Sequence, residues 1–164
     1  MKRSAIIILV LIFTYTLQAQ HVFNPGSVKF NAGLGVPQVN GYIPTINLSG
    51  EVGVIPTGTI GLVSFGGLLD FHIADDGKTF PRFYAGPRAA WHLHAFNSLI
   101  FDVYAGAGFG IVLNGNGLKE RNTIVAQADV FVGGRWMFSP GAGLFVELGV
   151  TGLSNARFGI TFGF

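Results

Sequence analysis

The sequence contains no cysteine. Disulfide bonds and thiolate metal sites are therefore excluded, as is lipid attachment through an N-terminal cysteine. Charged residues are also scarce, because Asp, Glu, Lys and Arg make up 11% of the chain, whereas a typical soluble domain contains about 25%. Hydrophobic residues reach 49%. We therefore expect a solvent other than water to cover part of this protein.

Long apolar runs are missing as well. After the first twenty residues there is no run of about 18 apolar residues, so the sequence offers no candidate for a transmembrane helix. The 164 residues are enough for one domain. The 25 glycines disfavour helices and the 16 phenylalanines favour strands. The composition therefore predicts an apolar domain built from β-strands.

The first residues are predicted to form a signal peptide for secretion. Lys2 and Arg3 give a positive start, residues 5–13 an apolar stretch, and Ala19 a small residue at the cleavage site. This apolar stretch is too short to span a bilayer, which takes about 20 residues. We predict a signal peptide at residues 1–19 and a single mature domain at residues 20–164.

An excess of basic charge is also absent from the mature chain. The full sequence has 10 Lys and Arg against 8 Asp and Glu, and loss of Lys2 and Arg3 with the signal leaves 8 against 8. The mature net charge is therefore zero. No stripe of Lys and Arg occurs either, so we expect no nucleic-acid partner.

Apolar residues alternate with small or polar ones along the mature chain. The end of the sequence shows this best, since every second residue from Phe158 to Phe164 is Phe or Ile. A period of two puts the two sets on opposite faces of a strand. The pattern predicts eight strands, at residues 27–36, 46–54, 59–72, 82–96, 99–113, 123–138, 143–152 and 157–164.

One face of each predicted strand is apolar, and the other holds polar residues and most of the glycine. Five of the eight acidic residues lie on the polar faces, which reverses the usual arrangement in soluble proteins. A β-sandwich would have to bury these acids between its sheets. A closed barrel in lipid fits better, because it pairs all backbone groups within the hydrocarbon. We predict an all-β fold, an eight-stranded antiparallel transmembrane β-barrel with the topology of an up-and-down meander.

Long and short connections alternate between the predicted strands. Outer-membrane barrels have longer external loops and short periplasmic turns. The protein is therefore expected in the outer membrane of a Gram-negative bacterium, in contact with its lipid, with both termini periplasmic. The predicted outer loops are residues 36–45, 73–81, 114–122 and 153–156. An aromatic girdle is predicted near the periplasmic ends, formed by Trp91, Phe101, Trp136, Phe138 and Phe164.

The end of the chain resembles a known family. The run from Gly133 to Pro140, the segment from Phe145 to Gly149 and the terminal Phe164 are similar to the last hairpins of small, porin-like outer-membrane β-barrel proteins of Bacteroidetes. The terminal phenylalanine is similar to the signal that the barrel-assembly machinery recognises, which implies that machinery as a partner during insertion. The resemblance specifies architecture and not activity, because such barrels serve many roles.

The interior of an eight-stranded barrel is just wide enough for side chains to fill. We therefore predict that inward-facing charges pair and plug the lumen. Counting around the predicted turns places Arg135 opposite Glu147 and His94 opposite Asp102. The predicted lumen polar network consists of Glu51, Asp70, Arg88, His92, His94, Asp102, Asp129, Arg135, Glu147 and Arg157.

The sequence gives only weak signals for metal binding, catalysis or phosphate binding. His92 and His94 share one strand face and His72 lies on the preceding strand, which fits a metal site but lacks a carboxylate at fixed spacing. Ser98 and Ser154, as nucleophiles of a lipid-modifying enzyme, have no histidine nearby in sequence. Glycines 106, 108 and 110 resemble a phosphate loop, but alternation puts them in the lumen, where they leave room for bulky side chains such as Arg88 and Tyr104.

The sequence therefore favours a non-enzymatic outer-membrane barrel, either structural or an accessory subunit of a larger envelope complex. No catalytic residue, metal site or cofactor is expected. Two alternatives stay open, a narrow pore for ions or small solutes and a membrane-embedded lipid-modifying enzyme.

Overall fold

The computed structural model describes residues 21–75, 79–94, 98–115 and 124–164. The predicted signal peptide lies outside these residues. Among the described residues, no helix is long and apolar enough to cross a membrane.

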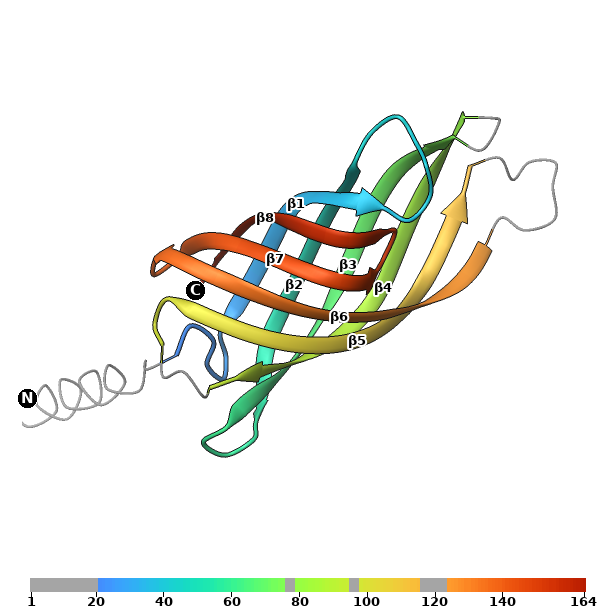
Figure 1. Cartoon of the computed structure of the whole chain (residues 1–164). Helices are drawn as coiled ribbons and strands as arrows, with labels where there is room; N and C mark the ends of the chain where they lie inside the picture. Colours follow the sequence, from blue (N-terminus) through green and yellow to red (C-terminus); the bar gives the residue numbers. More distant parts are fainter. Residues whose placement is uncertain (1–20, 76–78, 95–97, 116–123) are drawn as a thin grey trace, which may run out of the picture.

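Eight antiparallel strands follow one another around a closed barrel, and β8 pairs with β1 to complete it (Figure 1). This confirms the predicted all-β fold with eight antiparallel strands, and each predicted segment overlaps one observed strand. The strands are β1 (Val28–Pro37), β2 (Thr45–Pro56), β3 (Gly61–Asp75), β4 (Thr79–Leu93), β5 (Phe101–Asn114), β6 (Ile124–Ser139), β7 (Ala142–Thr151) and β8 (Ser154–Gly163).

The two faces of the strands differ as the alternation predicts. In β7, Leu144, Val146 and Leu148 are exposed on the outside, whereas Phe145 and Glu147 are buried inside. The same holds around the barrel, so that the outer surface is a continuous band of exposed aliphatic and aromatic side chains. The interior holds buried charged residues, namely Lys29, Asp70, Arg88, Asp102, Asp129, Arg135, Glu147 and Arg157.

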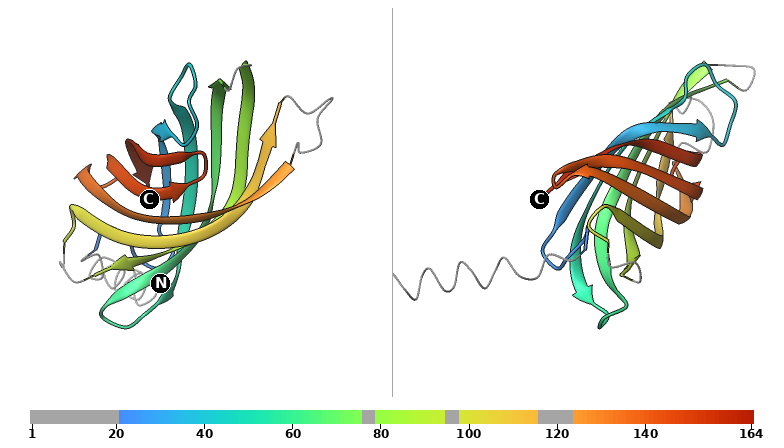
Figure 2. Two further views of the ribbon diagram at one scale, coloured as in Figure 1. Left: turned by 45° about the vertical axis from the view of Figure 1, so that its right-hand side comes forward. Right: turned by 60° about the vertical axis from the view of Figure 1, so that its left-hand side comes forward.

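The barrel has two unlike ends. We call the end where β1 begins and β8 finishes the terminus end, and the opposite one the loop end. Strands β3 to β6 are 14 to 16 residues long, whereas β1, β7 and β8 have 10 residues each. The wall of the loop end is therefore uneven, and β3 to β6 extend past β7 and β8 (Figure 2).

The β7–β8 connection is shorter than predicted. Thr151 already pairs with Ser154, so only Gly152 and Leu153 form the turn, in place of the expected loop at 153–156. Gly152 has a φ of 57°, which glycine adopts without strain. The turn lies inside the taller wall, where the fully buried Leu153 packs with Leu68 and other lumen residues.

The segment of residues 21–27 closes the terminus end, a feature that alternation did not predict. We call it the N-terminal plug. The ring of Phe23 is buried and stacks on the ring of His92, with 4.2 Å between centroids. Backbone hydrogen bonds of 2.9 and 3.0 Å tie Gly26 and Ser27 to Gly53 of β2. A side chain at Gly53 would collide with the backbone oxygen of Asn24, so glycine is needed there.

Candidate functional site

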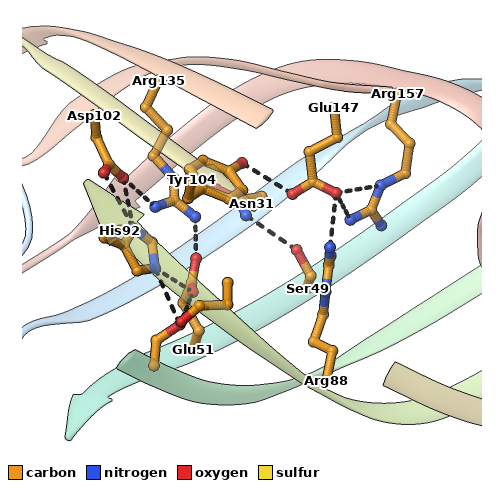
Figure 3. A network of polar contacts seen from close by, with 12 residues as sticks. Asn31, Ser49, Glu51, Arg88, His92, Asp102, Tyr104, Arg135, Glu147 and Arg157 are labelled. Carbon is orange, nitrogen blue, oxygen red and sulfur yellow. Dashed lines mark hydrogen bonds and ion pairs between the residues drawn. The ribbon is translucent and has the colours of Figure 1, made fainter. Parts of the chain in front are cut away.

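Arg135 of β6 is the centre of a buried polar network near the terminus end (Figure 3). Its Nη1 lies 2.7 Å from Oδ2 of Asp102 on β5, and its Nη2 donates to Glu51 of β2 across the lumen. The guanidinium also lies over the ring of Tyr104, 4.4 Å from the centroid. We call this group, extended by the residues described in the next paragraphs, the Arg135 network.

His92 bridges the same two carboxylates. Its Nδ1 lies 3.0 Å from both oxygens of Asp102, and its Nε2 lies 3.1 Å from Oε2 of Glu51. Since both ring nitrogens face carboxylate oxygens, both are expected to carry hydrogen and donate. The two positive groups, His92 and Arg135, then balance the two negative ones.

Ser64 of β3 completes an arrangement that sequence reasoning missed. Its Oγ lies 3.0 Å from Nε2 of His92, whose Nδ1 faces Asp102, as in the Ser-His-Asp triads of hydrolases. The same Oγ lies 2.5 Å from Oε2 of Glu51. A hydroxyl has one hydrogen to donate, and the shorter contact assigns it to Glu51. The only signal in the sequence was the polarity of Ser64 on an inward face.

Glu147 of β7 forms the second half of the Arg135 network. Its Oε2 accepts from Arg88 at 2.9 Å and from Nε of Arg157 at 3.1 Å, and Arg157 stands directly opposite it on β8. Its Oε1 accepts from the hydroxyl of Tyr104 at 2.9 Å, which joins both halves. One carboxylate therefore serves two guanidinium groups.

The predicted pair of Arg135 and Glu147 is wrong. Both side chains face the lumen as expected, but Glu147 stands opposite Gly133, and Arg135 stands opposite Phe145. The numbers of paired residues sum to 280 (133 and 147) and not to the 282 that Arg135 and Glu147 require. Two changes account for the difference. Ser139 pairs with Ala142, so the turn is one residue tighter than predicted, and the register shifts by one more residue between Met137 and Ser139.

The three histidines do not converge. Nε2 of His94 donates to the carbonyl oxygen of Phe23 at 3.0 Å, and the ring stacks on His21 at 3.8 Å. Asp102 is therefore engaged by His92 and not by His94 as predicted. His72 lies near the loop end, with Nε2 3.1 Å from the carbonyl oxygen of Val39. Within the described ranges, no three His, Asp or Glu side chains are grouped to hold a metal.

The lumen glycines leave room for bulky neighbours, as predicted in part. Gly108 lies against Arg88, as expected. Tyr104, however, lies against Gly133 of β6 and not against the predicted glycines of β5. Gly106 makes room for Phe131.

A second polar group lies near the loop end, where Asp70 and Asp129 hold the β7–β8 turn. Oδ2 of Asp70 accepts from the amide of Leu153 at 2.8 Å, and Oδ1 of Asp129 accepts from the amide of Gly152 at 2.6 Å. The other oxygen of each carboxylate has no hydrogen-bond partner among the described residues. Asn47 and Tyr84 stand directly opposite Asp70 on β2 and β4. We call Asn47, Asp70, Tyr84, Asp129 and Thr151 the Asp70 cluster.

No model of a known protein family matches this chain, and no curated protein matches it either. Function must therefore be argued from the barrel and its interior.

Proposed function

We propose that this chain is an integral outer-membrane protein of a Gram-negative bacterium and acts as a non-enzymatic structural or accessory subunit of an envelope complex. The observation that carries the proposal is the reversed polarity of the barrel. Arg135, Glu147 and Arg157 are almost fully buried inside, while large apolar side chains cover the outside. Such a surface is soluble in lipid and would aggregate in water.

The aromatic side chains support the same orientation. Trp91, Phe101, Trp136 and Phe138 are exposed on the outer surface near the terminus end, where an interfacial girdle would lie. The backbone of Phe164 is fixed to Val28 by hydrogen bonds of 2.8 and 3.1 Å, while its side chain is exposed. That ring is therefore free to be recognised by the barrel-assembly machinery. Likeness to the porin-like barrels of Bacteroidetes stays a prediction.

The packed lumen argues against a conducting pore. The Arg135 network crosses the lumen, from Glu51 on one wall to Arg135 on another, and Phe23 covers it at the terminus end. An ion that entered would have to separate paired charges, which costs several kcal/mol per ion in a low-dielectric interior. Planar-bilayer recordings should therefore show no steady conductance, and a stable open channel would support the pore alternative instead.

The hydrogen-bond pattern argues against acyl transfer at Ser64. A nucleophilic serine must give its proton to a neutral histidine, whereas His92 lies between two carboxylates and Ser64 donates to Glu51. Both side chains are also buried. Comparison of lipid A by mass spectrometry, with and without the gene, tests this point, and a changed acylation pattern would favour the enzyme alternative.

The location is tested by fractionation and by charge placed on the outer face. The mature protein should extract with outer membranes and migrate faster on a gel unheated than boiled.

Val132→Arg, at the middle of β6 on the exposed face, should cost about 2–4 kcal/mol of unfolding free energy in lipid, because the charge enters hydrocarbon. Ile124→Arg, on the same face near the rim, is the matched control and should cost about 0–1 kcal/mol. Equal costs would contradict the proposal.

A further inference from the structure

The two carboxylates of the Asp70 cluster are held side by side. Each accepts from one of two consecutive backbone amides, those of Gly152 and Leu153. Each also keeps one oxygen, Oδ1 of Asp70 and Oδ2 of Asp129, without a hydrogen-bond partner among the described residues. Nη1 of Arg157 forms an ion pair with Oδ1 of Asp70 at 3.8 Å, a distance too long for a hydrogen bond. Two carboxylate oxygens beside the same turn therefore lack a hydrogen bond.

Neutral oxygen atoms surround the same place. Asn47 and Tyr84 flank Asp70 in register on the neighbouring strands, and all three side chains face the lumen. Asn47 is 1% exposed and Tyr84 2%, and neither the amide of Asn47 nor the hydroxyl of Tyr84 has a partner in the described chain. The hydroxyl of Thr151, which precedes the turn, also lacks a partner within the part of the chain that the structure describes. Buried polar groups of this kind are usually satisfied, so their accumulation here points to a ligand.

The charges at this end do not balance. Arg88 and Arg157 both bind Glu147, and Asp70 and Asp129 add two more carboxylates nearby. Among these five groups, three are negative and two are positive. The missing charge is positive, and the unpartnered atoms of the Asp70 cluster are mainly oxygen, the donor that hard cations prefer.

We propose that the Asp70 cluster is a binding site for a hard cation such as Ca²⁺. Asp70 and Asp129 supply the anionic oxygens, and Asn47, Tyr84 and Thr151 supply neutral ones. The described residues bring no third carboxylate or histidine into the group, so a nitrogen-liganded metal such as zinc is disfavoured. Because the site also holds the β7–β8 turn, bound cation would fix the loop end of the barrel.

Calcium titration of the mature protein, refolded in detergent without lipopolysaccharide, tests the site directly. After treatment with EDTA and its removal, calorimetry should give a single site with a Kd of about 10⁻⁴–10⁻³ M, the range of extracellular calcium modules with few carboxylates. Added Ca²⁺ should raise the temperature at which the folded gel band is lost. Detergent removes the question of membrane location, so this test is independent of the proposed function.

Two variants and a matched control locate the ion. Asp70→Asn and Asp129→Asn keep an oxygen for the turn amides but remove one charge each, and either should raise the Kd at least tenfold. Asp75→Asn removes the same charge from the end of β3, outside the cluster, and should bind as the unaltered protein does. If added Ca²⁺ produces neither heat nor a thermal shift, the proposal is overturned, since water would then satisfy these groups. An equal shift in all four proteins would overturn it too.

Discussion

The Arg135 network and the Asp70 cluster differ in the partners that their buried carboxylates have. In the Arg135 network, Glu51, Asp102 and Glu147 each accept from at least two charged donors (Figure 3). In the Asp70 cluster, each carboxylate accepts from one backbone amide, and its neighbours have no partners among the described residues. Both groups lie inside the same barrel and are largely buried.

This difference distinguishes groups that stabilise the fold from groups that can bind a ligand. Ion pairs in a low-dielectric interior fix the positions of their side chains, and removal of one partner leaves the other charge buried without compensation. Groups without partners give the fold little stability but stay free to coordinate. The terminus end of the lumen therefore holds the wall together, and the loop end has the features of a site. The wall heights agree with this division, because the taller strands β3 to β6 enclose the Asp70 cluster and the β7–β8 turn.

Loss of Arg135 should produce the largest effect. Arg135→Met leaves Glu51 and Asp102 facing each other with only His92 between them, and should lower the unfolding free energy by about 3–5 kcal/mol. Urea unfolding of the refolded barrel measures it. Arg82→Met makes the same change where, among the described residues, Nε of Arg82 donates to Asn114 and to no carboxylate, and it should cost less than about 1 kcal/mol. Equal losses would show that pairing in the Arg135 network does not matter.

Removal of the plug ring should have the next largest effect. Phe23→Ala uncovers His92 and empties a buried aromatic site, with an expected cost of about 3 kcal/mol, the lower end for such truncations because water can enter at the mouth. Tyr42→Ala removes an exposed ring from the β1–β2 connection and should change stability by less than about 0.5 kcal/mol. If the two variants unfold alike in urea, the plug does not seal the network.

The same Asn→Leu substitution at two positions compares a hydrogen-bonded asparagine with one in the Asp70 cluster. Asn31 donates to Ser49 at 3.0 Å, whereas the amide of Asn47 has no partner in the described chain. Asn31→Leu should therefore cost about 1 kcal/mol or more, because it removes a formed hydrogen bond. Asn47→Leu, measured in EDTA, should be neutral or slightly stabilising. A greater loss for Asn47→Leu would mean that the Asp70 cluster is already satisfied.

Alternation predicted the strands and their faces, since a period of two is a local property of the chain. Eight of the ten predicted network residues are buried inside, whereas Glu51 is only half-buried and His94 lies beyond the end of β4. Alternation failed wherever the outcome depends on the distance between strands. Arg135 meets Glu51 across the lumen, from β6 to β2, and no count along a hairpin reveals that contact. A turn one residue tighter than predicted and a register shift between Met137 and Ser139 together moved Glu147 away from Arg135.

The N-terminal plug was missed for another reason. Apolar and polar residues do not alternate in residues 21–27. The packing of this segment depends on the absence of a side chain at Gly53 of β2. Ser64 was missed as a site residue because its role comes from Glu51 and His92, which lie on two other strands. Sequence pattern thus predicts which residues are inside, and barrel closure decides which of them meet.

The smallest expected effect concerns acid and the plug. Partial burial, and then the nearby His94 ring, lower the pKa of His21 from its ordinary value of 6.5. The fold therefore favours neutral His21, and the unfolded chain binds more protons between 6.5 and the lowered pKa. The contribution of His21 is complete above pH 6.5 and should fall as the pH drops through that window. His21→Gln removes this titration, so the unaltered protein should lose slightly more unfolding free energy than His21→Gln between pH 7.5 and pH 5. Lys29, which lines the same pocket as His21, is present in both proteins, so its contribution cancels in the comparison. Parallel losses in the two proteins would mean that the stacked ring pair does not hold the plug over the Arg135 network.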